Sequence, residues 1–175
     1  MIFRLTLLCL AFTSIAAMAG TRREALPEPV RHQFSLEYGL LNNADPANQT
    51  TSYAGMGLRY AYVFATGLAL AGESCHDELA AEAGAFYYTI SGFQNPSDQI
   101  TVVPAIITAR YGVAFGEYFT PFVYAGVMKN FSNRDILSRI RPALGAGAFI
   151  NVVRNFAVRA EIGTDLFAAG LVGQF

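Results

Sequence analysis

Five adjacent residues, Glu73-Ser74-Cys75-His76-Asp77, hold the densest group of reactive side chains in the sequence. Cysteine, histidine and carboxylate side chains are metal ligands, and a serine beside a histidine is a pairing used in acyl transfer. Consecutive residues of a strand point to opposite faces, however, so Cys75 and His76 would diverge. Two readings stay open: a reactive site, or the polar outer end of a strand that enters a loop. We expect no metal site and no cofactor.

Other charged residues occur at alternate positions within apolar segments, so that they share one face of each predicted strand. A charge facing lipid at mid-depth costs about 2–4 kcal/mol, whereas charges inside a closed barrel can pair. We therefore predict an interior ion-pair network, with Glu37 and Arg59 as its first pair. Its role is to stabilise the barrel or to gate small solutes, and the narrow interior of eight strands favours stability. The predicted members are Glu37, Arg59, Glu73, Arg110, Lys129, Arg159 and Glu161.

The elements that must position these charges show alternation with a period of two, which is typical of half-buried strands. Their lengths suit a tilted crossing of a bilayer, which takes about 9–11 residues. We predict an all-β fold, an eight-stranded antiparallel up-and-down transmembrane β-barrel, with strands at residues 34–42, 52–64, 67–75, 101–113, 119–130, 141–151, 155–163 and 166–175.

Residues 85–93 also alternate, but a ninth spanning strand would place the two ends of the barrel on opposite sides of the membrane. We place this segment in a long external loop, as an extension of a neighbouring strand or as a small hairpin arm. Residues 76–84 show the one helical propensity in the chain. Aromatic residues of the segment, such as Tyr87 and Phe93, would form a contact surface for a partner or fold back onto the barrel rim.

The faces predicted for the strands differ in residue type. Phe34, Leu36 and Tyr38 share the outward face of the first strand, and Met56, Leu58 and further bulky residues share that of the second. Glycines collect on the opposite, interior face. Aromatic residues at the periplasmic strand ends would form the girdle that barrels place at the membrane interface.

Composition supports a membrane-embedded chain. Of 175 residues, 53% are hydrophobic and only 14% are charged, whereas soluble domains average about 25% charged. No segment beyond the N-terminal leader offers the ~18 consecutive apolar residues of a spanning helix. A soluble secreted barrel is the alternative, but it leaves the shortage of charge without a cause. The formal net charge of -1 gives no field that would attract nucleic acid.

The N-terminus has the features of a secretion signal. Arg4 precedes an apolar run, and Ala17-Met18-Ala19 matches a cleavage site for small residues. We predict a signal peptide over residues 1–19, a periplasmic tail over 20–33 and the barrel over 34–175, exported to a bacterial outer membrane. Cys9 lies in the signal, so Cys75 alone remains and an intrachain disulfide is excluded.

Three segments carry a resemblance to a known family. They are Tyr118 to Val127, which contains Thr-Pro-Phe, Leu144 to Gly147, which contains Gly-x-Gly, and Asn155 to Glu161, which contains Val-Arg-Ala-Glu. With the final Phe175, they resemble the small outer-membrane β-barrels, including opacity-type proteins and the OmpA-type transmembrane domain. The resemblance implies eight strands and no open channel. It also implies assembly by the outer-membrane insertion machinery, which makes Phe175 the assembly signal.

The same resemblance raises an enzymatic alternative. Some barrels of this kind are lipid A deacylases with a His-x-Ser-Asn motif, but Ser132-Asn133 has no such histidine and no His follows His76. We predict a non-enzymatic barrel with an envelope-structural or surface-interaction role, and we keep a lipid A-modifying or lipid-binding barrel as the alternative. The expected partners are outer-membrane lipid and lipopolysaccharide. Candidate contacts to lipopolysaccharide phosphates are Arg134, Arg139 and Arg141, which are otherwise ordinary solvated loop charges.

Overall fold

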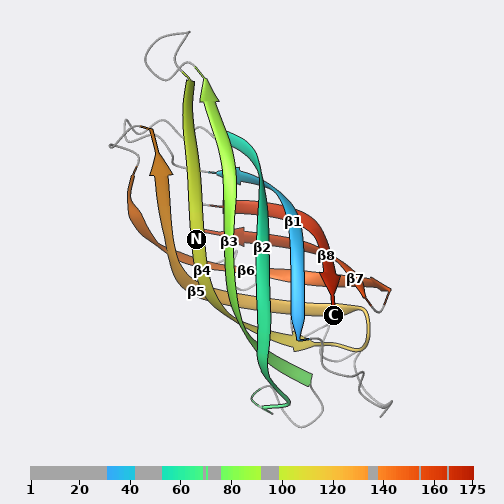
Figure 1. Cartoon of the computed structure of the whole chain (residues 1–175). Helices are drawn as coiled ribbons and strands as arrows, with labels where there is room; N and C mark the ends of the chain where they lie inside the picture. Colours follow the sequence, from blue (N-terminus) through green and yellow to red (C-terminus); the bar gives the residue numbers. More distant parts are fainter. Residues whose placement is uncertain are drawn as a thin grey trace, which may run out of the picture.

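The eight strands of the computed structural model form one sheet that closes on itself (Figure 1). Every pair of neighbouring strands is antiparallel, and β1 closes the barrel against β8. The predicted eight-stranded barrel is confirmed. The structure describes residues 31–41, 53–68, 70, 76–91, 99–133, 138–153, 155–164 and 166–175. The strands are β1 (His32–Leu41), β2 (Tyr53–Thr66), β3 (His76–Ser91), β4 (Gln99–Ala114), β5 (Phe119–Ser132), β6 (Ile140–Val153), β7 (Phe156–Gly163) and β8 (Leu166–Gln174).

Among the described residues, no helix is long and apolar enough to cross a membrane.

The two ends of the barrel differ in the links that they carry. Arg31, His32 and Phe175 meet at one end, where the backbone amides of Arg31 and His32 donate to the Phe175 carbonyl. We call this end, which also carries the β2–β3, β4–β5 and β6–β7 links, the terminal end. The opposite, loop end carries the other four links, and the β3–β4 hairpin projects beyond the neighbouring strands there (Figure 1).

The prediction for the third strand was wrong. Residues 76–91 form β3. This one strand includes residues 76–84, which were expected to be helical, and most of residues 85–93, which were expected in an external loop. Residues 67, 68 and 70 belong to the β2–β3 link. The Ala- and Glu-rich sequence favours a helix intrinsically, but pairing with β2 and β4 along its length overrides that preference. The number of strands stays at eight because β3 takes the place of the strand predicted at residues 67–75. The predicted tail also ends earlier, since His32 and Gln33 are already part of β1.

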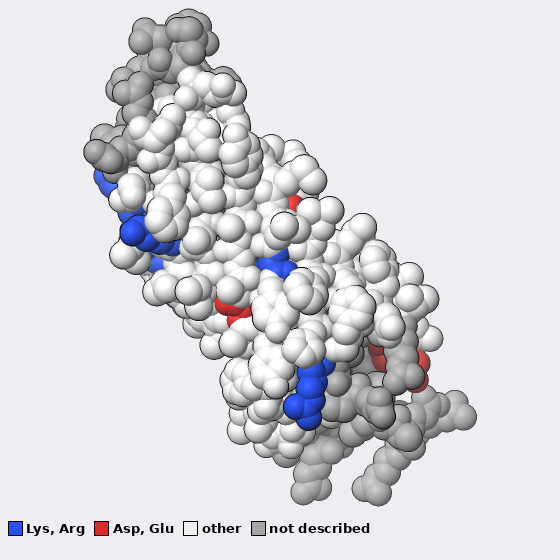
Figure 2. Space-filling model, viewed as in Figure 1, with Lys and Arg blue, Asp and Glu red and all other residues white. Residues whose placement is uncertain are grey.

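The outward face is apolar over most of the barrel. Alternating exposure runs through β1 without interruption, with Phe34, Leu36 and Tyr38 exposed. The same holds for Met56 and Leu58 of β2, as the sequence predicts. Figure 2 shows that uncharged residues make up most of the face in view.

Glycine and aromatic residues fill the interior in pairs. Gly57 lies directly across from Phe86, and Gly147 directly across from Phe122. A Cβ atom on Gly57 would lie 2.3 Å from the Phe86 ring. Small residues therefore leave the space that the large rings on adjacent strands occupy, which is how a small barrel fills its lumen.

Two apolar clusters divide the interior along its length. The cluster at the loop end includes Leu41, Tyr88 and Ile100, and the second cluster, toward the terminal end, includes Phe122 and Phe149. Buried charged residues of β1, β2, β3, β4 and β7 lie between them. The barrel wall and both clusters thus enclose a charged layer away from both ends.

Candidate functional site

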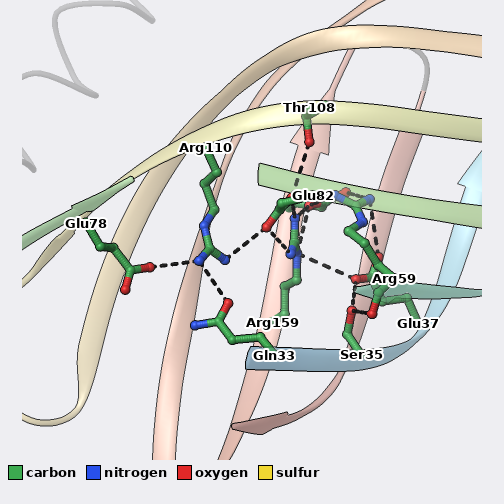
Figure 3. A network of polar contacts seen from close by, with 10 residues as sticks. Gln33, Ser35, Glu37, Arg59, Glu78, Glu82, Thr108, Arg110 and Arg159 are labelled. Atoms are coloured by element: carbon green, nitrogen blue, oxygen red, sulfur yellow. Dashed lines mark hydrogen bonds and ion pairs between the residues drawn. The ribbon is translucent and has the colours of Figure 1, made fainter. Parts of the chain in front are cut away.

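Glu82 of β3 is the centre of the charged layer, because it contacts three arginines (Figure 3). Its carboxylate lies 3.2 Å from Arg59 Nη1, 3.0 Å from Arg110 Nη1 and 3.0 Å from Arg159 Nη2. Thr108 Oγ1 also donates to Glu82 Oε2 over 3.4 Å. One carboxylate thus joins guanidinium groups from β2, β4 and β7.

Two further carboxylates complete the layer on the side of β1 and β7. Glu161 accepts from Arg59 Nη2 at 2.6 Å and also pairs with Arg159. Glu37 lies 3.4 Å from Arg59 Nη2 and 3.6 Å from Arg159 Nε. The hydroxyl of Ser35 donates to Glu37 Oε1 over 2.6 Å. We call the six ionic residues the mid-barrel network: Glu37, Arg59, Glu82, Arg110, Arg159 and Glu161.

The mid-barrel network is electrically balanced and buried. It has three cations and three anions, and the members are at most 5% exposed. A buried charge without a partner costs several kcal/mol, so the balance is what a stable interior requires. Toward the terminal end, Arg110 Nη2 also donates to Gln33 and to Glu78, each at 2.8 Å. Glu78 retains some solvent exposure.

Aromatic rings cover the guanidinium groups. Arg159 lies 4.8 Å from the centre of the Phe122 ring, and Arg110 lies 4.5 Å from that of Phe149. Arg59 lies between Phe86 and Tyr124, at 5.8 Å and 6.0 Å. An arginine is suited to this position because its plane stacks on rings while its edge donates to carboxylates. The arrangement stabilises the buried charge, and each of these carboxylates is paired with arginine.

Five of the seven residues predicted for the network lie together in this layer: Glu37, Arg59, Arg110, Arg159 and Glu161. The placement of Lys129 was wrong, because it is exposed on the outward face of β5 and its Nζ lies 4.9 Å from the Phe131 ring. Bulky residues occupy both faces of β5, with Phe122 inside and Val123 outside. Hydrophobicity therefore does not identify the inner face there. Glu73 lies outside the described residues.

Sequence reasoning missed Glu82 and Glu78. Both were assigned to an external loop, because the third strand was predicted at residues 67–75 and not at 76–91. A signal was present, since Glu78 and Glu82 are an even number of residues apart and share a face with Phe86 once residues 76–91 are one strand. The register of β3 against β2 then brings Glu82 opposite Ala61, near Arg59.

The two predicted lipopolysaccharide contacts that the structure describes, Arg139 and Arg141, lie at the loop end. Arg139 is exposed just before β6, whereas Arg141 is half-buried within β6. Arg134 lies outside the described residues. Lys129, which pairs with Ile140 across the β5–β6 ladder, adds a cation to this side of the barrel.

Phe175 is exposed at the terminal end, and its backbone amide donates to the His32 carbonyl over 2.9 Å. Its ring lies 6.5 Å from that of Phe34. The residue proposed as an assembly signal is thus bound across the seam between the first and last strands.

The described part of the reactive run, His76 and Asp77, is at the terminal end, not at the outer end expected. His76 begins β3, and Asp77 is buried, accepting from the Leu70 amide at 2.9 Å and from the Tyr111 hydroxyl at 3.1 Å. Ser74 and Cys75 lie outside the described residues. In the described part of the chain, no three His, Cys, Asp or Glu side chains are grouped to hold a metal ion.

A shallow groove of about 470 Å³ crosses the outward face of β6, β7, β8 and β1. Its lining combines alanines with larger residues such as Tyr38, Ile162 and Phe167. Glu161 is the one carboxylate in its lining, and it already pairs with two arginines. The groove is apolar and provides no nucleophile with an adjacent base.

Comparison with known proteins identifies the fold. No family model and no curated protein matches the sequence. Among solved structures, a de novo designed transmembrane β-barrel is 18% identical with a TM-score of 0.56, covering 85% of this chain and 98% of that one. The fold is that of a transmembrane β-barrel.

A natural barrel shares this fold. The Yersinia pestis outer membrane protein Ail, in a phospholipid bilayer nanodisc, is 15% identical with a TM-score of 0.51, covering 84% of this chain and all of that one (100%). Ail, the attachment invasion locus protein, in complex with the heparin analogue sucrose octasulfate gives the same identity and TM-score, covering 83% of this chain and 97% of that one. At this identity the likeness extends to the fold.

Proposed function

We propose that this chain is a non-enzymatic barrel of a bacterial outer membrane that contributes to the envelope and contacts lipopolysaccharide at its loop end. The observation that carries the proposal is the filled lumen, where a balanced ion-pair layer lies between two apolar clusters. A lumen occupied by side chains leaves the outward surface and the loop end for interaction with other molecules. The mid-barrel network then acts in stability.

A location in the outer membrane also indicates which end of the barrel faces the periplasm. In outer-membrane barrels the short turns are periplasmic and the longer loops are extracellular. The longest link of this barrel, residues 42–52, lies at the loop end, whereas the terminal end carries two short turns, at residues 115–118 and 154–155, besides the link at 67–75. We therefore take the terminal end as periplasmic and the loop end as extracellular. Insertion machinery would read the C-terminal strand with Phe175, and residues 1–19 would direct export.

Cations at the loop end support contact with lipopolysaccharide. Lys129 and Arg139 are exposed there. Arg141 follows in β6, and Arg134 belongs by sequence to the link between β5 and β6. Arg binds phosphate oxygens through two parallel hydrogen bonds, and Lys contributes a point charge. Ail supplies a parallel, because it has been solved with an anionic heparin analogue.

The alternative, a lipid A-modifying barrel, has weaker support. Its candidate residues were Ser74 and His76, and His76 lies at the terminal end. With the periplasmic orientation, this places it away from the lipopolysaccharide leaflet. The apolar groove beside Glu161 also lacks a nucleophile and base.

Two measurements test the proposal. A heat-modifiable shift on electrophoresis in the outer-membrane fraction is expected, because a folded barrel migrates differently from the boiled chain. Mass spectrometry of lipid A from cells with and without the protein should give the same spectrum. A gained or lost acyl chain would overturn the non-enzymatic assignment, and recovery of the protein in the soluble fraction would overturn the location.

A further inference from the structure

The outward face of the β3–β4 hairpin near the loop end differs from the apolar surface below it. Tyr87 is 57% exposed there, and the hydroxyls of Thr89 and Thr101 hydrogen-bond its phenol. The Thr101 amide donates to the side chain of Asn133 over 3.3 Å. The hairpin thus presents an aromatic ring surrounded by hydroxyl and amide groups.

This surface continues onto β5. Phe131 is half-exposed and pairs with Val103 of β4. Strand β4 lies between β3 and β5. The spacing of strands places Tyr87 and Phe131 about 10 Å apart. Lys129, two residues before Phe131 on the same face, holds its ammonium group over the Phe131 ring. We call Tyr87, Thr89, Thr101, Phe131 and Lys129 the hairpin patch.

The charged side chains that the structure describes on this side of the barrel are cations. In the described part of the chain, the outward loop-end half of β3 to β6 carries Lys129 and the neighbouring Arg139 but no carboxylate. Figure 2 shows blue atoms at one edge of the molecule, close to one of the undescribed regions, and an otherwise mostly uncharged surface between them and the centre. Among the described residues, no carboxylate on this surface repels an anionic partner.

The surface below the patch fits hydrocarbon. Alanines at positions 81, 83 and 85 of β3 lie directly across from Ala109, Ile107 and Ala105 of β4, and all face outward. A lipid whose chains lie along this smooth apolar strip presents its head group at the hairpin patch. A head group made of sugar rings and phosphates matches both the aromatic ring and the cations above.

We infer that the hairpin patch binds the phosphorylated sugars of lipopolysaccharide, with Tyr87 stacking on a sugar ring and Lys129 pairing with a phosphate. The C–H face of a sugar ring carries slight positive charge and packs against the negative face of an aromatic ring. Sugar hydroxyls find partners in Thr89 and Thr101. The inference rests on the proposed function and names the group that the loop end recognises.

The test uses the full folded protein in nanodiscs of neutral phospholipid, with Tyr87→Leu, Lys129→Gln and the control Tyr118→Leu. Tyr118 is also exposed, at 67%, but lies at the terminal end, in the β4–β5 link. Binding is titrated with fluorescent lipopolysaccharide, with phosphatidylglycerol as an anionic lipid without a sugar ring, and with sucrose octasulfate. The heat-modifiable shift confirms that each variant is folded.

Tyr87→Leu should weaken lipopolysaccharide binding about 2- to 10-fold and leave phosphatidylglycerol binding unchanged. Lys129→Gln should weaken binding of both lipopolysaccharide and phosphatidylglycerol. Tyr118→Leu should change the binding of neither. Equal lipopolysaccharide binding by Tyr87→Leu and the wild type would overturn the inference while the proposed function stands. Loss of phosphatidylglycerol binding as well would show that sugar is not the recognised group. An effect confined to sucrose octasulfate would assign the patch to soluble anionic glycans instead. Wild-type protein that binds no lipopolysaccharide would overturn both.

Discussion

Replacement of Glu82 by glutamine tests the mid-barrel network most directly. Glutamine keeps the size of the side chain and removes its charge. In the wild type, Glu82 lies 3.0–3.2 Å from guanidinium nitrogens of Arg59, Arg110 and Arg159. The variant leaves these three cations facing the two fully buried carboxylates of Glu37 and Glu161.

The expected loss of stability follows from that imbalance. Removing one partner of a buried ion pair costs about 3–5 kcal/mol, because the remaining charge stays buried. We expect Glu82→Gln to reach that range, since Arg110 keeps only Glu78, which is partly exposed to solvent. With a urea m-value near 2 kcal/mol per M, the unfolding midpoint should fall by about 1.5–2.5 M.

The assay is urea unfolding of the barrel in phospholipid vesicles, followed by its heat-modifiable electrophoretic mobility. Glu78→Gln is the matched control, because it removes the same charge from a more exposed site with one arginine partner. Its midpoint should change by less than half as much. The double variant Glu82→Gln/Arg110→Gln restores balance between two cations and two anions.

The double variant decides whether charge balance is the cause. If it is, the double variant should be more stable than the sum of the two single changes predicts, by about 1–3 kcal/mol. A Glu82→Gln midpoint within 0.5 M of wild type, a margin of about 1 kcal/mol, would refute the reasoning. Strictly additive single changes would show that lost packing, not unpaired charge, destabilises the variants.

Three further changes test other parts of the structure by the same unfolding assay. Gly57→Ala should destabilise by about 1–3 kcal/mol, since the new Cβ would meet the Phe86 ring, and Gly173→Ala, where the nearest atom is 3.3 Å away, should cost less. Tyr88→Phe should be neutral or stabilise by about 1 kcal/mol, because its buried hydroxyl has no hydrogen-bond partner among the described residues; a loss above that size would contradict this. Lys129→Met should change stability by less than about 1 kcal/mol, as expected for an outward residue near the membrane interface, and a loss of several kcal/mol would place Lys129 in a buried pair.

Several features of this protein follow from the sequence alone. Alternation with a period of two is a property of the extended chain itself, so the outward face of β1 and β2 is readable from Phe34, Leu36, Met56 and Leu58. Low charge together with the absence of a long apolar run indicates a barrel. Because charge is expensive against lipid, the inward placement of Arg59 and Arg159 also follows from sequence.

Tertiary structure decided the rest. Residues 76–84 favour a helix locally, and only pairing with both β2 and β4 makes them part of a strand. That strand brings in Glu82, whose three arginine partners lie on strands far apart in sequence. On β5 both faces are bulky, so closure of the barrel alone determines that Tyr124 faces in and Lys129 faces out. Periodicity reveals a face only where the two faces differ in chemistry, and the pairing of charges depends on register, which closure of the barrel fixes.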